Sequence, residues 1–223
     1  RLALVRSGKL GAVTQAQVSA AHGYHGISLI RKFLGLGFEN ATIRGMRFVS
    51  PIIAGPGRAG PPAQEIVRDS TQNLAFLDFD GKLGVFDFTG DQYFSWIRSG
   101  RILIRGERGE IHDTSLRYLQ DHVTPICAEL LRDDAGHDGS LEGYYHKGVV
   151  AGGERVYDNP FAPARLSDEE IAVATCMYKM GQYVRTGQEF YSLAEAAQDR
   201  YLDVMMTRAV ETGQVVRTET QPW

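Results

Sequence analysis

The chain has few cysteines, no long hydrophobic run and no clustered charge. Its two cysteines, Cys127 and Cys176, belong to no CxxC pair, so no zinc site is expected. Their spacing does not exclude a disulfide, but two reduced, buried thiols of a cytoplasmic protein are the preferred interpretation. No apolar run approaches the ~20 residues that cross a bilayer, and the N-terminal residues lack a signal-peptide pattern. The net charge of −3 comes without a basic patch. These absences predict a cytoplasmic protein whose partners are neither nucleic acid nor membrane.

The composition is typical of a folded globular protein. Of 223 residues, 43% are hydrophobic and 23% are charged, and this length suits one large domain or two small ones. Residues 1–8 have the pattern of the last turns of a helix that ends at a glycine. Because so short a helix is not stable alone, we expect the chain to be part of a longer polypeptide.

The central element of the predicted fold is a β-hairpin over residues 73–89. Apolar residues alternate in two runs separated by Asp80-Gly81. This pair favours a type I′ turn, which needs φ > 0 at both central residues. Residues 101–105 are predicted to form a third strand nearby. Apolar side chains fall on both faces of the hairpin. We therefore expect the sheet to be covered on both sides by the chain's own helices, and another protein chain is a further candidate for this role.

Other local patterns place the elements around the hairpin. Strands are predicted at residues 11–21 and 41–51, with a helix at 25–34 between them. Residues 54–63 are a loop by composition. After the hairpin, residues 91–98 form an aromatic connection, and short strands over 116–157 are broken by the Asp- and Gly-rich cluster 133–143.

The last part of the chain is predicted to be helical. Capping boxes at Ser167–Glu170 and Ser192–Glu195 start two helices, which end near Gly187 and Gly213. The predicted inward stripes are Ile171, Ala174, Tyr178 and Gly181 in the first helix, and Ala197, Tyr201, Val204 and Met205 in the second. The short connection predicts antiparallel neighbours. Strands followed by helices indicate an α+β fold, with helices on a mostly antiparallel sheet.

A GxGxxG pattern at residues 55–60 has an acidic residue, Asp80, about 20 residues further on, as in dinucleotide-binding folds. In those folds a helix begins within the pattern and presents free N–H groups to the pyrophosphate. Here Pro56, Pro61 and Pro62 remove such donors, and the next segment alternates like a strand. We therefore expect a rigid surface or active-site-lining loop and no nucleotide site.

Taken in order, several segments resemble one enzyme family. They are Leu4–Gly11, His25–Gly35, Phe79–Lys82, Leu103–Ile111 and Asn159–Phe161, followed by the two capped helices. Their order is similar to that in the C-terminal domain of the glucose-fructose oxidoreductase / inositol dehydrogenase / rhizopine-catabolism oxidoreductases (Gfo/Idh/MocA). Each motif is weak alone, but together they cover most of the chain.

The resemblance implies a fold and a function. Residues 1–223 would be a single C-terminal substrate-binding and oligomerisation domain, built on an open, mostly antiparallel sheet with helices packed on one face. The family's N-terminal Rossmann domain and its Glu-Lys-Pro motif with a catalytic lysine are not in this sequence. The full-length protein would use NAD or NADP to oxidise a sugar, polyol or related hydroxy compound. No cofactor is expected on this chain alone, and homo-oligomers, dimers at least, are expected through the sheet face.

The resemblance places His25 at the family's catalytic histidine. Ala21 stands where the family has a catalytic Asp, and Ser28 occupies a position that is often acidic. The helix dipole at the start of the predicted helix favours a neutral imidazole, which can accept a proton from a hydroxyl as hydride leaves. His25 is therefore the candidate general base.

Further residues are candidates for substrate binding. His22 and Tyr24 flank His25, Arg58 in the Gly- and Pro-rich loop could hold an anion, and the amphipathic cluster Gln92, Trp96 and Arg98 could stack on and hydrogen-bond a sugar. A polar turn, a solvated arginine and ordinary aromatic packing are the structural alternatives for these three sets. A non-catalytic binding or dimerisation module of the same fold is the alternative function, because the family's Asp is missing. A hydrolase is not supported, since no G-x-S-x-G or paired acid cluster is present.

Overall fold

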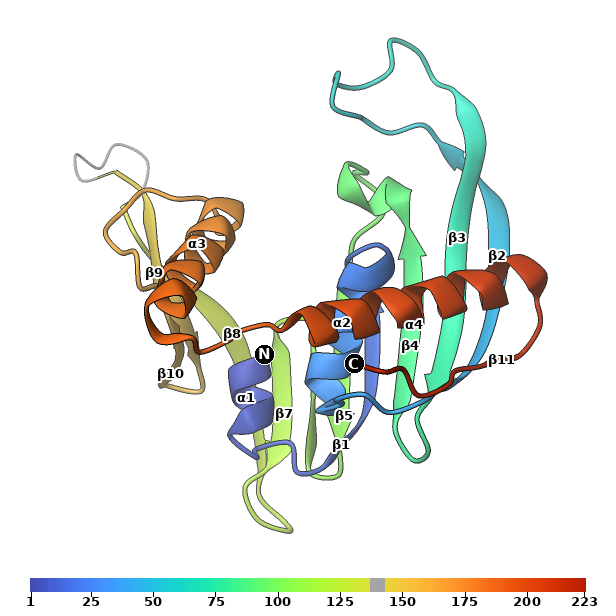
Figure 1. The fold of residues 1–223 in the computed structure, drawn as a ribbon. Helices are drawn as coiled ribbons and strands as arrows, with labels where there is room; N and C mark the ends of the chain where they lie inside the picture. The colour runs from blue at the N-terminus through green and yellow to red at the C-terminus, as the bar shows by residue number, and fades with distance from the viewer. Residues whose placement is uncertain (137–142) are drawn as a thin grey trace.

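The computed structural model describes residues 1–136 and 143–223, which form one open sheet with helices against it (Figure 1). Most of the predicted Asp- and Gly-rich cluster lies in 137–142, outside the described residues. The helical elements are α1 (Leu2–Arg6), α2 (Gly23–Leu34), the short 3-10 helix η1 (Gly90–Tyr93), α3 (Asp168–Thr186) and α4 (Leu193–Thr212). The strands are β1 (Val13–Ser19), β2 (Thr42–Ile53), β3 (Val67–Asp78), β4 (Leu83–Thr89), β5 (Arg101–Gly106), β6 (Gly109–His112), β7 (Ser115–Leu119), β8 (Pro125–Ala135), β9 (Tyr145–Ala151), β10 (Glu154–Asp158) and β11 (Val216–Arg217).

The predicted α+β class is confirmed. The strand order is β10-β9-β8-β7-β6-β5-β1-β4-β3-β2-β11. All neighbouring pairs are antiparallel except β1 and β4, which are parallel. The third predicted strand, β5, therefore does not pair with the hairpin, because β1 lies between them. Because of this insertion, β1 is an inner strand of the sheet, and the start of α2 follows directly after the end of this strand.

The central hairpin forms as its turn residues predict. Asp80 and Gly81 have φ values of 56° and 94°, and the N–H of Phe79 donates to the carbonyl of Lys82 at 2.9 Å. Both positive φ values belong to the type I′ turn, whose twist matches that of the flanking strands.

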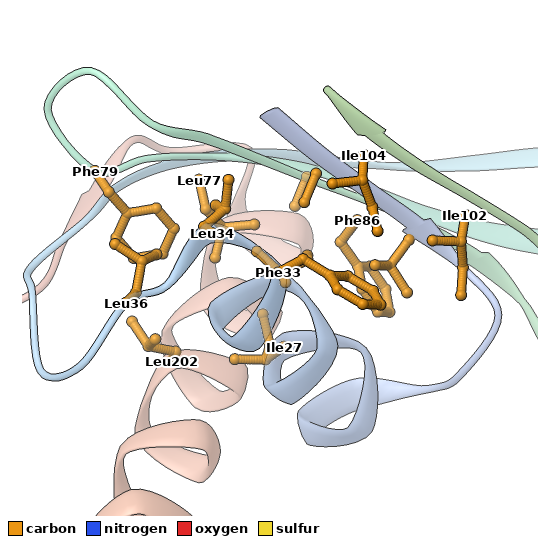
Figure 2. Packing of buried hydrophobic residues seen from close by; sticks show 14 of the residues in the cluster. Ile27, Phe33, Leu34, Leu36, Leu77, Phe79, Phe86, Ile102, Ile104 and Leu202 are labelled. Atoms are coloured by element: carbon orange, nitrogen blue, oxygen red, sulfur yellow. The ribbon is translucent and has the colours of Figure 1, made fainter. Parts of the chain in front are cut away.

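The main hydrophobic core lies between the sheet and helices α2 and α4. Figure 2 shows Ile27, Phe33 and Leu34 of α2 among side chains of the sheet, with Leu202 of α4 beside them. Each of these four residues is at most 5% exposed. With Ile30, the three α2 residues recur at i, i+3, i+6 and i+7, which gives α2 one apolar face. Burial of this face fixes the position of the residues at the start of α2.

The other face of the sheet carries no helix of the described chain. By the strand pairing, Met46, Phe48 and Phe76 lie on this face, and they are 53%, 47% and 53% exposed. The prediction of apolar side chains on both faces is therefore correct, but the chain's own helices cover only one of them.

The two C-terminal helices form where predicted, but they bury other residues. Both capping boxes are present, and both helices end at a left-handed glycine. In α3 only Ile171 is buried, while Tyr178 is exposed. In α4 the buried residues are Gln198, Asp199, Leu202, Asp203, Met206, Ala209 and Val210. The predicted stripe of α4 was wrong because polar side chains are buried there with partners, including Asp199 with Arg31.

The helices are also not antiparallel neighbours. Helix α4 packs on α2, β2 and β3, whereas α3 lies apart from it beside β8 and β9 (Figure 1). Arg132 of β8 holds the start of α3 through Asp168, at 3.0 Å.

Both cysteines are free, but neither is buried as predicted. By the strand pairing, Cys127 lies on the helix-free side of β8, and Cys176 is on the exposed surface of α3. Across the described ranges, no helix has the length and apolar character of a membrane span.

Candidate active site

The candidate site begins where β1 passes into α2. His22 is the N-cap residue of α2, and Gly23 follows with φ 46°. A Cβ on Gly23 would lie 3.0 Å from Oδ1 of Asp203 in α4. Both the positive φ and this close approach favour glycine at the position. The glycine thus lets the start of α2 lie directly against α4.

His25 lies in the first turn of α2 and is exposed at the rim of a cavity of about 380 Å³. The cavity lies between the two helices and is lined by Tyr24, His25 and Ser28 of α2, by Ala196, Asp199 and Arg200 of α4, and by Tyr191 just before α4. A cavity of this size admits a small molecule. The predicted general base is therefore accessible.

His22 and Tyr24 lie with His25, as their sequence proximity suggests. The rings of Tyr24 and His25 have centroids 4.2 Å apart, and those of His22 and His25 are 4.9 Å apart. His22 Nδ1 is hydrogen-bonded to the hydroxyl of Tyr93 in η1. Tyr24 lines the cavity directly, while His22 joins α2 to η1.

The other predicted substrate-binding residues lie elsewhere. Gln92 and Arg98 line a second cavity of about 230 Å³, whose walls include Gln72 and Thr89 of the helix-free face. There the Gln92 amide donates to the carbonyls of Ser19, at 2.8 Å, and Ser99, at 2.6 Å.

Two further predicted residues, like His22, belong to neither cavity lining. Trp96 is 78% exposed. Arg58 lies over the ring of Phe94, 5.8 Å from its centroid. The roles assigned to these residues, as to His25, stay predictions.

Sequence reasoning missed the polar network behind the cavity. Arg31, 1% exposed, donates to the Asp199 carboxylate and to the carbonyl of Gly37. The Tyr191 hydroxyl is bonded to the same carboxylate and lies 3.0 Å from Oγ of Ser28. Burial, together with the Asp199 carboxylate, raises the pKa of Tyr191. An arginine within the apolar stripe of α2 was the available signal, because a buried guanidinium needs an acidic partner.

No helix begins in the loop with the GxGxxG pattern, which lies between β2 and β3. Gly57 and Gly60 form an isolated bridge, and the chain continues into strand β3. The loop therefore lacks the helix N-terminus that binds a pyrophosphate. Within the described ranges, no group of three or more His, Cys, Asp or Glu residues could hold a metal ion.

Comparisons with known proteins give structural matches only. No protein-family model matches the sequence, and no curated protein matches it. An oxidoreductase domain protein from Kribbella flavida is 16% identical with a TM-score of 0.57, and the match covers 98% of this chain and 62% of that one. An NAD-binding oxidoreductase from Klebsiella pneumoniae is 10% identical with a TM-score of 0.54, covering 98% and 62%. An oxidoreductase from Agrobacterium radiobacter, solved with NAD+, L-tartaric acid and magnesium, is 13% identical with a TM-score of 0.52, covering 96% and 59%.

The chain thus spans roughly 60% of the length of these solved structures. Because nearly all of it matches, the likeness concerns the whole sheet and its helices. The resemblance to the Gfo/Idh/MocA oxidoreductases is confirmed at the level of the fold: the chain has the fold of part of these oxidoreductase chains.

Proposed function

We propose that the chain is the substrate-binding and oligomerisation domain of an NAD(P)-dependent oxidoreductase that acts on a sugar, polyol or related hydroxy compound. The observation that carries this proposal is the accessible cavity between α2 and α4, with His25 at its rim, in a fold shared with an NAD-binding oxidoreductase. In this proposal the dinucleotide is held by a Rossmann domain of the same polypeptide, as the resemblance to the Gfo/Idh/MocA oxidoreductases implies.

In this proposal the chain's own residues bind the substrate and move a proton. NAD or NADP, when bound to the other domain, supplies the acceptor for hydride. His25 accepts the proton of the reacting hydroxyl, since a neutral imidazole is a suitable base near pH 7. Tyr24 forms one wall of the cavity, and Ser28 and Tyr191 place hydroxyl groups in it.

The test is an activity assay on the polypeptide encoded by the complete gene. NAD+ and NADP+ are supplied in turn with a panel of sugars, polyols and hydroxy acids, and formation of the reduced nicotinamide is followed by absorbance. We expect turnover with at least one neutral polyhydroxy compound. Failure of every substrate with both cofactors would favour the alternative, a non-catalytic binding or dimerisation module, which is consistent with Ala21 at the family's Asp position.

The helix-free sheet face is the proposed homo-oligomer interface. Met46, Phe48 and Phe76 place exposed apolar surface there, and contiguous apolar patches of this kind mark interaction sites. We expect Phe76→Asp to weaken self-association about 30-fold, corresponding to ~2 kcal/mol for an interface anchor. Sedimentation over a concentration series measures this effect.

The matched control for the interface is Val123→Asp, at an exposed residue of the β7–β8 loop. This variant should associate like the wild type. A wild-type chain that stays monomeric at every concentration would contradict the proposed interface.

A further inference from the structure

A row of hydrogen bonds leads from the buried side of α2 to the cavity beside His25. Arg31 donates to Oδ1 of Asp199, and the Tyr191 hydroxyl is bonded to Oδ2 of the same carboxylate. Oγ of Ser28 then lies 3.0 Å from the Tyr191 oxygen. Ser28, Tyr191 and Asp199 all line the cavity, so the row ends at the space in which a ligand would bind.

The chemistry of the groups fixes the direction of each bond. A guanidinium only donates and a carboxylate only accepts, whereas a hydroxyl has a single proton to give. Tyr191 must therefore donate its proton to Asp199. Its oxygen can then only accept from Ser28, and this bond uses the single proton of Ser28.

Burial of the Arg31–Asp199 ion pair maintains the donor-to-acceptor direction of these hydrogen bonds. Arg31 and Asp199 are 1% and 3% exposed, and the buried Arg31 charge has the Asp199 carboxylate as its ion-pair partner. Burial and the neighbouring carboxylate also raise the pKa of Tyr191, so its phenol stays protonated at neutral pH. The Ser28 oxygen consequently faces the cavity with lone pairs and no free proton.

We propose that Ser28 is a specificity-determining residue that accepts a hydrogen bond from a hydroxyl of a neutral polyol. A carboxylate at the same place would bring an acceptor against an acceptor, with no proton between the two oxygens. Tyr191 is a positioning residue, since it acts through Ser28. This inference rests on the proposed function and adds to it the substrate class: a polyol rather than a hydroxy acid at this position.

Two probes with the same carbon skeleton test this selectivity. L-threitol has CH2OH groups where L-tartrate has carboxylates. Calorimetric titrations on the complete polypeptide should show tighter binding of L-threitol. Ser28→Ala should weaken L-threitol binding about 5- to 10-fold, the effect of one neutral hydrogen bond, and should strengthen L-tartrate binding, because the opposing acceptor is removed. Tyr191→Phe releases the Ser28 proton and should shift the affinity ratio toward L-tartrate by a similar factor.

Tyr183→Phe is the matched control, because it removes an exposed tyrosine hydroxyl on α3 and should leave both affinities unchanged. No binding of L-threitol, a wild-type preference for L-tartrate, or an unchanged ratio in Tyr191→Phe would overturn the proposal. A neutron structure of the deuterated wild-type chain tests the bond direction without any variant. The Ser28 deuteron should point at the Tyr191 oxygen, and a deuteron pointing into the cavity would refute the assignment.

These outcomes separate the inference from the proposed function. If L-threitol binding depends on Ser28 and Tyr191 but no substrate is oxidised, the role of Ser28 is supported and the proposed oxidoreductase activity is excluded. If a polyol is oxidised and neither variant changes this reaction, the oxidoreductase activity is supported and the role of Ser28 in specificity is excluded.

Discussion

Asp199→Ala should lower the free energy of unfolding by about 3–5 kcal/mol, because it leaves the buried charge of Arg31 without its partner. Both side chains of this ion pair are nearly inaccessible, at 1% and 5% exposure, so hydration of the Arg31 charge would only partly replace the lost carboxylate. The pair joins α2 to α4 behind the cavity. Urea unfolding with linear extrapolation measures the loss as a lower midpoint at a similar slope.

Glu211→Ala is the matched control, since Glu211 lies on the same helix and is also paired with an arginine. Its carboxylate is 3.7 Å from Arg47, and both side chains are about half exposed. An exposed pair of this kind contributes at most about 1 kcal/mol. A second control replaces both buried partners by apolar residues, Arg31→Met with Asp199→Leu, and should recover much of the loss. Equal losses in Asp199→Ala and Glu211→Ala would show that the buried pair does not stabilise the contact between the helices.

His25→Ala should lower turnover of the complete polypeptide by about 10²- to 10⁴-fold, the usual contribution of a general base. The side chain is exposed at the cavity rim, so its removal should leave the unfolding midpoint almost unchanged. Steady-state assays with the best substrate of the panel give the effect on turnover. Unfolding of the same preparation shows that the loss is not one of folding.

His122→Ala controls for the removal of an exposed imidazole, because His122 lies in the β7–β8 loop outside the cavity. It should behave like the wild type in both measurements. Turnover of His25→Ala within twofold of the wild type would take His25 out of the mechanism.

Local signals in the sequence were enough for most elements of the fold. The Asp80-Gly81 turn and the capping boxes at Ser167 and Ser192 need only neighbouring residues to act, and all three form as predicted. Interactions between distant segments were not predictable in this way. Nothing local indicates that β1 inserts between β4 and β5, since this pairing joins residues far apart in the chain.

The buried face of α4 shows the same limit. An apolar stripe through Val204 was predicted, yet the helix turns Asp199 and Gln198 inward, because Arg31 and the indole N–H of Trp223 satisfy them. Polar residues could be assigned to the core only with these partners known. The cysteines were misplaced for a related reason: an apolar sequence neighbourhood does not tell which face of a strand or helix is covered.

The candidate site was predictable only in its first half. His22, Tyr24 and His25 are neighbours in sequence, and the structure places them together. Tyr191 and Asp199 join them from a segment more than 160 residues away, and Gln92 and Arg98 line a different cavity. A site formed by two distant helix starts therefore needs the fold before its second half can be named.

The central claim is that this sheet and its cavity complete a dehydrogenase whose dinucleotide is held by other residues of the same polypeptide. Fluorescence titration with NADH and NADPH, on the polypeptide of the complete gene and on residues 1–223 side by side, tests this claim most directly. We expect saturable binding of one or both dinucleotides by the complete polypeptide and none by residues 1–223. Absence of binding by the complete polypeptide, or equal binding by both, would contradict it.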